Sequence, residues 1–134
     1  RLESGQGDVE GWRRLARARW TMGETDAARS ALAKALALEP DNPALLVEYG
    51  AVLVDPPNAD SDLPRVTEDA QKAFEKAALL APGDPEPWWY LGIRALQEGK
   101  KSIARAHWQH VLSLLPPDHP DRPAITARIA AIQG

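Results

Sequence analysis

Three segments of the chain repeat one pattern of small and large residues, and this internal repeat limits the possible folds more than any other feature. The segments are residues 27–43, 70–85 and 103–120, and each ends in a turn that contains proline. Matching alanines are spaced by 42 and then 34 residues, and the terminal prolines have the same spacing: Ala28, Ala70 and Ala104; Pro40, Pro82 and Pro116. Two independent marks with identical intervals indicate a repeated structural unit.

The segments that precede them also match one another. They correspond at a large residue and, four positions later, at a small one: Trp12, Leu46 and Trp88; Ala16, Gly50 and Gly92. Gly23 and Gly99 fall in short turns between the apolar, helix-periodic segments. The unit is therefore helix, turn, helix with a period of 34 residues, and eight extra residues are inserted in the second unit.

The composition excludes several classes of function. The chain has no cysteine, so disulfides and thiolate chemistry are absent, and its net charge of −3 disfavours nucleic acid as the main partner. No apolar run reaches the roughly 20 residues that span a bilayer. Because the sequence begins at Arg1 rather than methionine, we expect a fragment or a processed form.

A search for chemistry finds no catalytic constellation. The serines lack a nucleophile-elbow context, and no glycine-rich phosphate loop is present. His107 and His110 are three residues apart on one predicted helix and could meet at one metal ion, but no third ligand follows at helical spacing, so we interpret them as surface or interface histidines. The insertion lacks the glycine and the terminal glutamate of an EF-hand. We predict neither an enzyme nor a metal or cofactor site.

The repeats resemble the tetratricopeptide repeat (TPR), through "WYLG" at residues 89–92 and "AHWQHVLSLLP" at 106–116. This resemblance covers about residues 9–118. It implies an all-α fold, a right-handed superhelix of three helix-turn-helix repeats plus a C-terminal capping helix. We expect a single domain over residues 1–134, with repeats at 9–42, 43–84 and 85–118. The second repeat contains a solvated loop at about 54–64, and the capping helix covers about 121–132.

In the TPR family the first helix of each repeat lines a concave groove, so the repeat register assigns residues to that groove. The predicted groove residues are Arg13, Arg17, Trp20, Val47, Ala51, Val54, Trp89, Ile93 and Leu96. Trp88 aligns with Trp12 and is assigned to packing, whereas Trp89 is assigned to the groove. Arg13 or Arg17 could bind a terminal carboxylate; the alternative is a salt bridge, for example with Glu10. The alternative for Trp20 and Trp89 is packing against a neighbouring helix or against a segment upstream of this chain.

A narrower resemblance rests on the insertion, on the opening "DVEGWRRLARARWTMGETDAA" at residues 8–28, and on the sequence Leu115-Pro116-Pro117-Asp118. These features are similar to the periplasmic TPR domain of cytochrome c maturation proteins of the CcmI/CycH type and the related NrfG. The resemblance implies a periplasmic chaperone module that holds the C-terminal helix of apocytochrome c for the haem lyase, without a cofactor. The module would reach the membrane only through a segment not present in this chain. The alternative is a generic TPR scaffold that joins folded partners in another complex.

Overall fold

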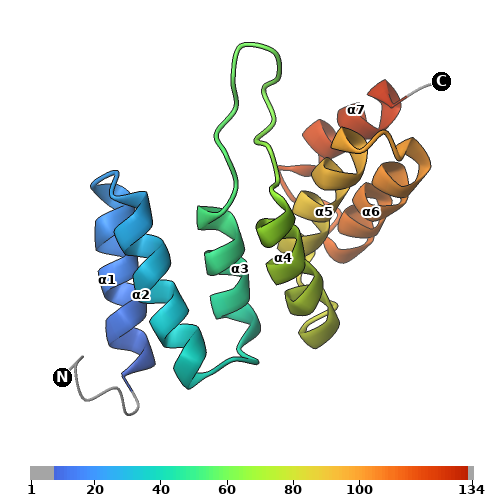
Figure 1. Ribbon diagram of the computed structural model, residues 1–134. Coiled ribbons are helices and arrows are strands. Elements are labelled where there is room, and N and C mark those ends of the chain that lie inside the picture. Colours follow the sequence, from blue (N-terminus) through green and yellow to red (C-terminus); the bar gives the residue numbers. More distant parts are fainter. Residues whose placement is uncertain (1–7, 133–134) are drawn as a thin grey trace.

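The computed structural model describes residues 8–132, so the ends of the predicted domain, residues 1–7 and 133–134, lie outside the described part. The described helices are α1 (Val9–Thr21), α2 (Thr25–Leu38), α3 (Pro43–Val52), α4 (Glu68–Leu80), α5 (Pro85–Gln97), α6 (Lys101–Leu114) and α7 (Arg122–Ala131). Figure 1 shows the first six stacked in sequence as antiparallel pairs, with α7 beside the last pair. The predicted all-α TPR superhelix is confirmed.

Local sequence signals set the starts of several helices. The side chain of Asn42 accepts hydrogen bonds from two backbone N–H groups at the start of α3, and that of Asp84 accepts one at the start of α5. In both helices a proline follows the cap, where its missing N–H costs no intrahelical hydrogen bond. The short α1–α2 and α5–α6 turns contain Gly23 and Gly99, whose φ angles of 80° and 77° suit a residue without a Cβ atom.

Close packing within the second and third pairs depends on two glycines. A Cβ atom at Gly50 would lie 2.8 Å from the ring of Phe74, and one at Gly92 would lie 2.2 Å from Nε1 of Trp108. Both aromatic rings are fully buried. The indole N–H of Trp108 also donates a hydrogen bond of 3.1 Å to the carbonyl oxygen of Trp89. The glycines of the repeat signature are therefore required by the aromatic rings that face them.

The buried residues form two clusters. The smaller cluster joins α1 and α2 to one side of α3, and includes Ala16, Leu32 and Leu45. The larger cluster runs from α3 to the end of α7, and includes Phe74, Ile93 and Trp108. The isoleucines of the predicted capping helix belong to the larger cluster, since Ile125 and Ile132 are buried and Ile129 packs against it. This helix covers the last repeat, as a terminal element of a repeat array must.

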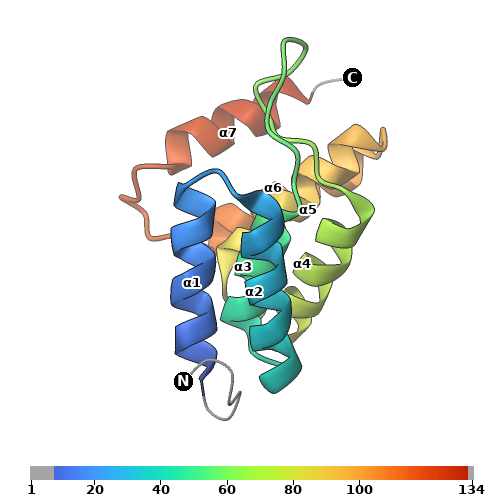
Figure 2. The same cartoon turned by 60° about the vertical axis from the view of Figure 1, so that its left-hand side comes forward.

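The insertion between α3 and α4 projects beyond the ends of the helices as a hairpin (Figure 1). At its base, Asp55 and Arg65 exchange two backbone hydrogen bonds, with N–O distances of 2.8 and 2.9 Å. Residues 55–62 are exposed, whereas Val66 is fully buried. Figure 2 shows the hairpin at the same end of the molecule as α7. The loop is thus solvated at its tip but ordered at its base.

The side chains of Trp88 and two histidines pack together on α5 and α6. The Trp88 ring is T-shaped to the ring of His110, with 4.8 Å between centroids, and lies 5.3 Å from the ring of His107. Burial lowers the pKa of His107 below its ordinary value, and His110 adds to this effect. The two histidines therefore support the indole packing of the α5–α6 pair.

We expect His107 to make stability depend on pH. Because its pKa is lower in the folded state, the unfolded chain binds the proton first, and the folded state loses stability as the pH falls below about 6.5. Replacing His107 with Asn should reduce this loss. Urea denaturation at pH 7.5 and pH 5.5 measures it in both proteins, and an equal loss in the variant would contradict the assignment.

Candidate functional site

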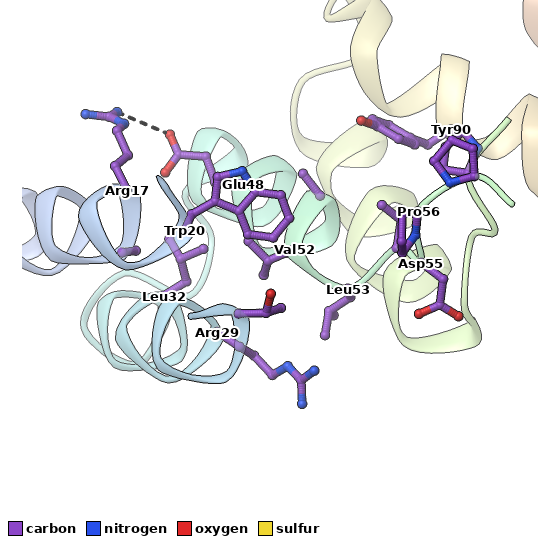
Figure 3. Close-up of a pocket in the computed structure, with 16 residues that line it drawn as sticks. Arg17, Trp20, Arg29, Leu32, Glu48, Val52, Leu53, Asp55, Pro56 and Tyr90 are labelled. Carbon is purple, nitrogen blue, oxygen red and sulfur yellow. Dashed lines mark ion pairs between the residues drawn. The ribbon is translucent and has the colours of Figure 1, made fainter. Parts of the chain in front are cut away.

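A cleft of about 800 Å³ lies between the first two repeats and the insertion (Figure 3). We call it the repeat-one cleft. Residues from α1, α2, α3, α5 and the insertion line it: Ala16, Arg17, Trp20, Thr25, Arg29, Leu32, Glu48, Ala51, Val52, Leu53, Val54, Asp55, Pro56, Pro57, Pro64 and Tyr90. Its size is within the range typical of ligand-binding sites.

Trp20, near the end of α1, is the large exposed aromatic residue of this cleft. Trp20 is 47% exposed, which is unusual for a large apolar residue, whereas Val52 in the same cleft is buried. Figure 3 shows the indole ring on the opposite side of the cleft from Pro56 and Tyr90. A half-exposed tryptophan beside an apolar floor is the type of residue that anchors a protein or peptide partner.

The two arginines predicted for the groove differ in their surroundings. Arg13 donates hydrogen bonds to Glu48 and, over 2.8 Å, to Glu10, and its side chain is only 18% exposed. The hydrogen bond to Glu48 raises the pKa of Arg13 above its ordinary value. Arg17 is 62% exposed and contacts Glu48 at 3.5 Å (Figure 3). Both arginines therefore form ion pairs with Glu48, and Arg17 is the more exposed of the two.

The structure brings together four of the nine residues predicted for the groove, namely Arg17, Trp20, Ala51 and Val54. Val47 and Ile93 do not line the cleft as predicted, because both side chains are buried in the larger core cluster. That cluster also contains Val66 of the insertion and Ile125 of α7, two elements added to the basic repeat. Leu96 is half-buried and packs against the same cluster, and it does not line the repeat-one cleft.

Trp89 does not share a cleft with these four residues but lines a second one. Its ring stacks on Trp108, with 5.1 Å between the centroids and 23° between the planes. It lines a smaller cleft of about 480 Å³, formed by Pro85, Glu86, Trp89, Val111, Leu115, His119, Asp121, Ala124 and Ile125. Trp88 and Trp89 are both half-buried, so burial alone does not separate a scaffold tryptophan from a groove tryptophan.

Several lining residues were missing from the sequence prediction. Tyr90 lines the repeat-one cleft and stacks on Phe74, with 4.4 Å between the ring centroids, and burial raises its pKa. Arg29 of α2 and the prolines of the insertion also contribute. Helical periodicity gives no sign of the prolines, because it does not predict where an inserted loop folds back.

Two absences hold for residues 8–132. None of the described helices has the length and apolar character needed to cross a membrane. The same residues contain no group of three or more acidic, histidine or cysteine side chains able to hold a metal ion.

Comparison with solved structures places the architecture among TPR proteins. The MamA protein superposes with a TM-score of 0.75 at 19% identity, covering 95% of this chain and 63% of that one. The Yersinia enterocolitica chaperone SycD in complex with a YopD peptide gives 0.70 at 15% identity, covering 92% and 88%. At these identities the likeness concerns the fold alone.

Sequence comparison identifies relatives more specifically. The cytochrome c-type biogenesis protein CycH of Bradyrhizobium diazoefficiens is 28% identical over 99% of this chain, and that of Rhizobium meliloti is 32% identical over 93%. The chain spans 35% and 32% of the lengths of these two proteins. Residues 1–122 match the model of the family described as "Cytochrome c-type biogenesis protein H TPR domain". With a TPR fold and a match over most of its length, the chain belongs to the family of cytochrome c-type biogenesis protein H TPR domains.

Proposed function

We propose that this domain is a non-catalytic peptide-binding chaperone module in c-type cytochrome maturation. It holds the C-terminal helix of apocytochrome c in the repeat-one cleft and presents it to the haem ligation complex. The observation that carries this proposal is the half-exposed Trp20 at an apolar cleft of about 800 Å³. An amphipathic helix that lays its apolar face in such a groove is a common mode of peptide recognition.

The charges of the cleft suit the carboxyl end of a peptide. Arg17 is the better candidate for this contact, because Arg13 is already held by Glu10 and Glu48. The guanidinium group of Arg17 contacts Glu48 only at 3.5 Å and is largely exposed. A guanidinium group can bind a carboxylate through two parallel hydrogen bonds.

Similar folds with bound peptides support a peptide as the ligand class. SycD was solved with a peptide of the translocator YopD, and the first TPR domain of Spaghetti with an HSP90 peptide. The second structure has a TM-score of 0.72 at 16% identity and covers 93% of this chain and 90% of that one. The CycH relatives supply the connection to cytochrome c biogenesis. We place the domain in the periplasm, as the soluble part of a membrane-anchored protein.

The Trp20→Ala substitution should weaken binding of a peptide from the C-terminal helix of an apocytochrome c. We expect a loss of about 2 kcal/mol, or roughly 30-fold in Kd, the size of a hot-spot truncation. Isothermal titration calorimetry with this peptide and a scrambled version measures the effect. Met22→Ala is the matched control, because Met22 is exposed nearby but does not line the cleft. Equal affinity for the two peptides in the unmodified protein would reject the proposal.

The second candidate function is a generic TPR scaffold that joins folded partners in another envelope or multiprotein complex. It is favoured by exposed apolar side chains on α4 and α6, where Leu79 is 84% exposed and Ile103 is 45% exposed. They border another cleft of about 790 Å³. A partner that is retained by the Trp20→Ala variant and lost after Leu79→Ser would favour this function over the chaperone.

A further inference from the structure

The inserted hairpin supplies much of one side of the repeat-one cleft, beside Tyr90 of α5. Five of its residues line the cleft, and three of these are prolines: Val54, Asp55, Pro56, Pro57 and Pro64. Figure 3 shows Pro56 across the cleft from Trp20. Prolines present an apolar ring and have few backbone conformations to lose, so they form a stiff apolar surface.

One glutamine of α5 holds the base of the hairpin through both atoms of its amide group. The Nε2 atom of Gln97 donates a hydrogen bond of 2.7 Å to the carbonyl oxygen of Pro64. Its Oε1 atom accepts one of 3.1 Å from the backbone N–H of Val66. The side chain thus pairs with the loop as a neighbouring strand would, and it satisfies a backbone N–H next to the core.

Further contacts fix the hairpin at three other points. Arg94 donates a hydrogen bond of 2.9 Å to the carbonyl oxygen of Val66, and Thr67 donates one of 2.8 Å to that of Leu53. Near the tip, Asp62 accepts hydrogen bonds from Arg128 of α7. The hairpin is therefore held by α5, by the end of α3 and by α7 in the protein without a ligand.

The cleft lining carries two acids and two arginines, so its formal charge is balanced, but the arginines have the longer ion-pair contacts. The lining contains two acids, Glu48 and Asp55, and each has an arginine partner outside the lining: Arg13 for Glu48, and Arg65 at 2.8 Å for Asp55. The two lining arginines have looser contacts, at 3.5 Å for Arg17 and 3.6 Å for Arg29. An anionic group of a ligand would therefore find guanidinium donors that are not fully used.

We infer that the inserted hairpin is a pre-formed wall that determines which ligands the repeat-one cleft accepts. It selects a peptide that carries a large apolar or aromatic side chain next to a carboxylate. The side chain fits between Trp20 and the prolines, and the carboxylate pairs with Arg17 or Arg29. Gln97 is a positioning residue, which touches the wall and not the ligand. This inference rests on the proposed peptide-binding function and names the chemistry that the same cleft recognises.

The benefit of a fixed wall is a smaller entropy loss on binding. Ordering the residues of a flexible loop on binding costs backbone conformational entropy. A hairpin held by Gln97, Arg94 and Arg128 has already incurred that cost on folding, so more of the contact energy remains for affinity. Loosening the wall should therefore weaken binding even when every contact residue of the cleft is retained.

The first test loosens the wall through Gln97→Ala, with Gln109→Ala on α6 as the matched control. The minimal probe is N-acetyl-phenylalanine, which combines an aromatic ring with a carboxylate, and its amide serves as the neutral comparison. NMR titration of the Trp20 indole N–H measures the Kd. Hydrogen exchange of the Val66 amide reports whether its hydrogen bond to Gln97 is retained. We expect Gln97→Ala to accelerate this exchange and to weaken binding by about ten-fold, the effect of about 1.4 kcal/mol. The control should change neither.

The second test removes the apolar surface of the wall while its anchors remain. Pro56→Ala with Pro57→Ala should weaken binding of N-acetyl-phenylalanine by about ten-fold. Asp60→Ala, at the exposed tip outside the cleft lining, should have no effect. The inference is wrong if the double variant binds the probe as tightly as the unmodified protein. It is also wrong if Gln97→Ala accelerates Val66 exchange without weakening binding. Equal binding of the acid and its amide by the unmodified protein would contradict it as well.

The two proposals fail separately. If the unmodified protein binds N-acetyl-phenylalanine in this cleft but does not distinguish the apocytochrome peptide from its scrambled version, the chaperone function is rejected and the wall is retained. If it prefers the apocytochrome peptide but both wall variants bind as tightly as the unmodified protein, the wall is rejected and the chaperone function is retained. If it does not bind N-acetyl-phenylalanine, the proposed ligand chemistry is wrong.

Discussion

Replacing Gly92 with alanine is expected to destabilise the domain by about 3 kcal/mol, the upper end of the usual cost of overpacking. The new Cβ atom would lie 2.2 Å from Nε1 of Trp108, a ring that is fully buried and hydrogen-bonded to the carbonyl oxygen of Trp89. The sign is diagnostic, because glycine to alanine inside a helix ordinarily stabilises by up to about 1 kcal/mol. Chemical denaturation of both proteins measures the difference.

Gly83→Ala is the matched control for this result. A Cβ atom at Gly83 would meet no other atom within 4 Å, so its effect should stay within about 0.5 kcal/mol. Gly50→Ala should give an intermediate loss, because its Cβ atom would lie 2.8 Å from the Phe74 ring. If Gly92→Ala were as stable as Gly83→Ala, the close approach of α5 and α6 would be incorrect.

Truncation of Trp108 to alanine is expected to cost about 3–5 kcal/mol, the range for large core residues. Trp108 is the largest fully buried side chain, and its removal would leave a cavity between α5, α6 and the ring of Trp89. It would also leave the carbonyl oxygen of Trp89 without the indole hydrogen bond. Thermal and urea unfolding measure the loss.

Trp20→Ala serves as the comparison for the Trp108 variant. Trp20 is 47% exposed, so its removal should cost less than about 1 kcal/mol of stability while it weakens peptide binding. The two substitutions thus separate a core tryptophan from a binding tryptophan. If both cost the same stability, Trp20 would be a packing residue, and the assignment of the repeat-one cleft as a binding site would lose its main support.

The sequence predicts the TPR fold because its marks are local and periodic. Small residues pair with large ones at a fixed spacing, and the two vary together. Ala16 occurs in the repeat with Leu32, whereas Gly92 occurs in the repeat with the larger Trp108. The isoleucines of α7 follow a helical stripe, and this stripe predicts their burial. Each of these features depends on residues within one or two turns of helix or within one repeat.

The groove could be predicted only in part, because the repeat register assumes that every repeat has the same neighbours. Ile93 has the position of a groove residue, but it belongs to a core cluster with Val66 of the insertion and Ile125 of α7. The first repeat has no such additions, and Arg17 and Trp20 remain accessible there. The contacts of Gln97 with the insertion span 31 and 33 residues and follow no periodic pattern, so the sequence does not predict them.

The division of the interior into two clusters has a consequence for the cooperativity of folding. In a repeat array each unit is stabilised mainly by its neighbours, so the first repeat, with its own small cluster, need not unfold together with the rest. The repeat-one cleft joins α1 and α2 to Tyr90 and to the insertion, which belong to the other part. A ligand held there would contact both parts, so its binding energy would favour their opening together.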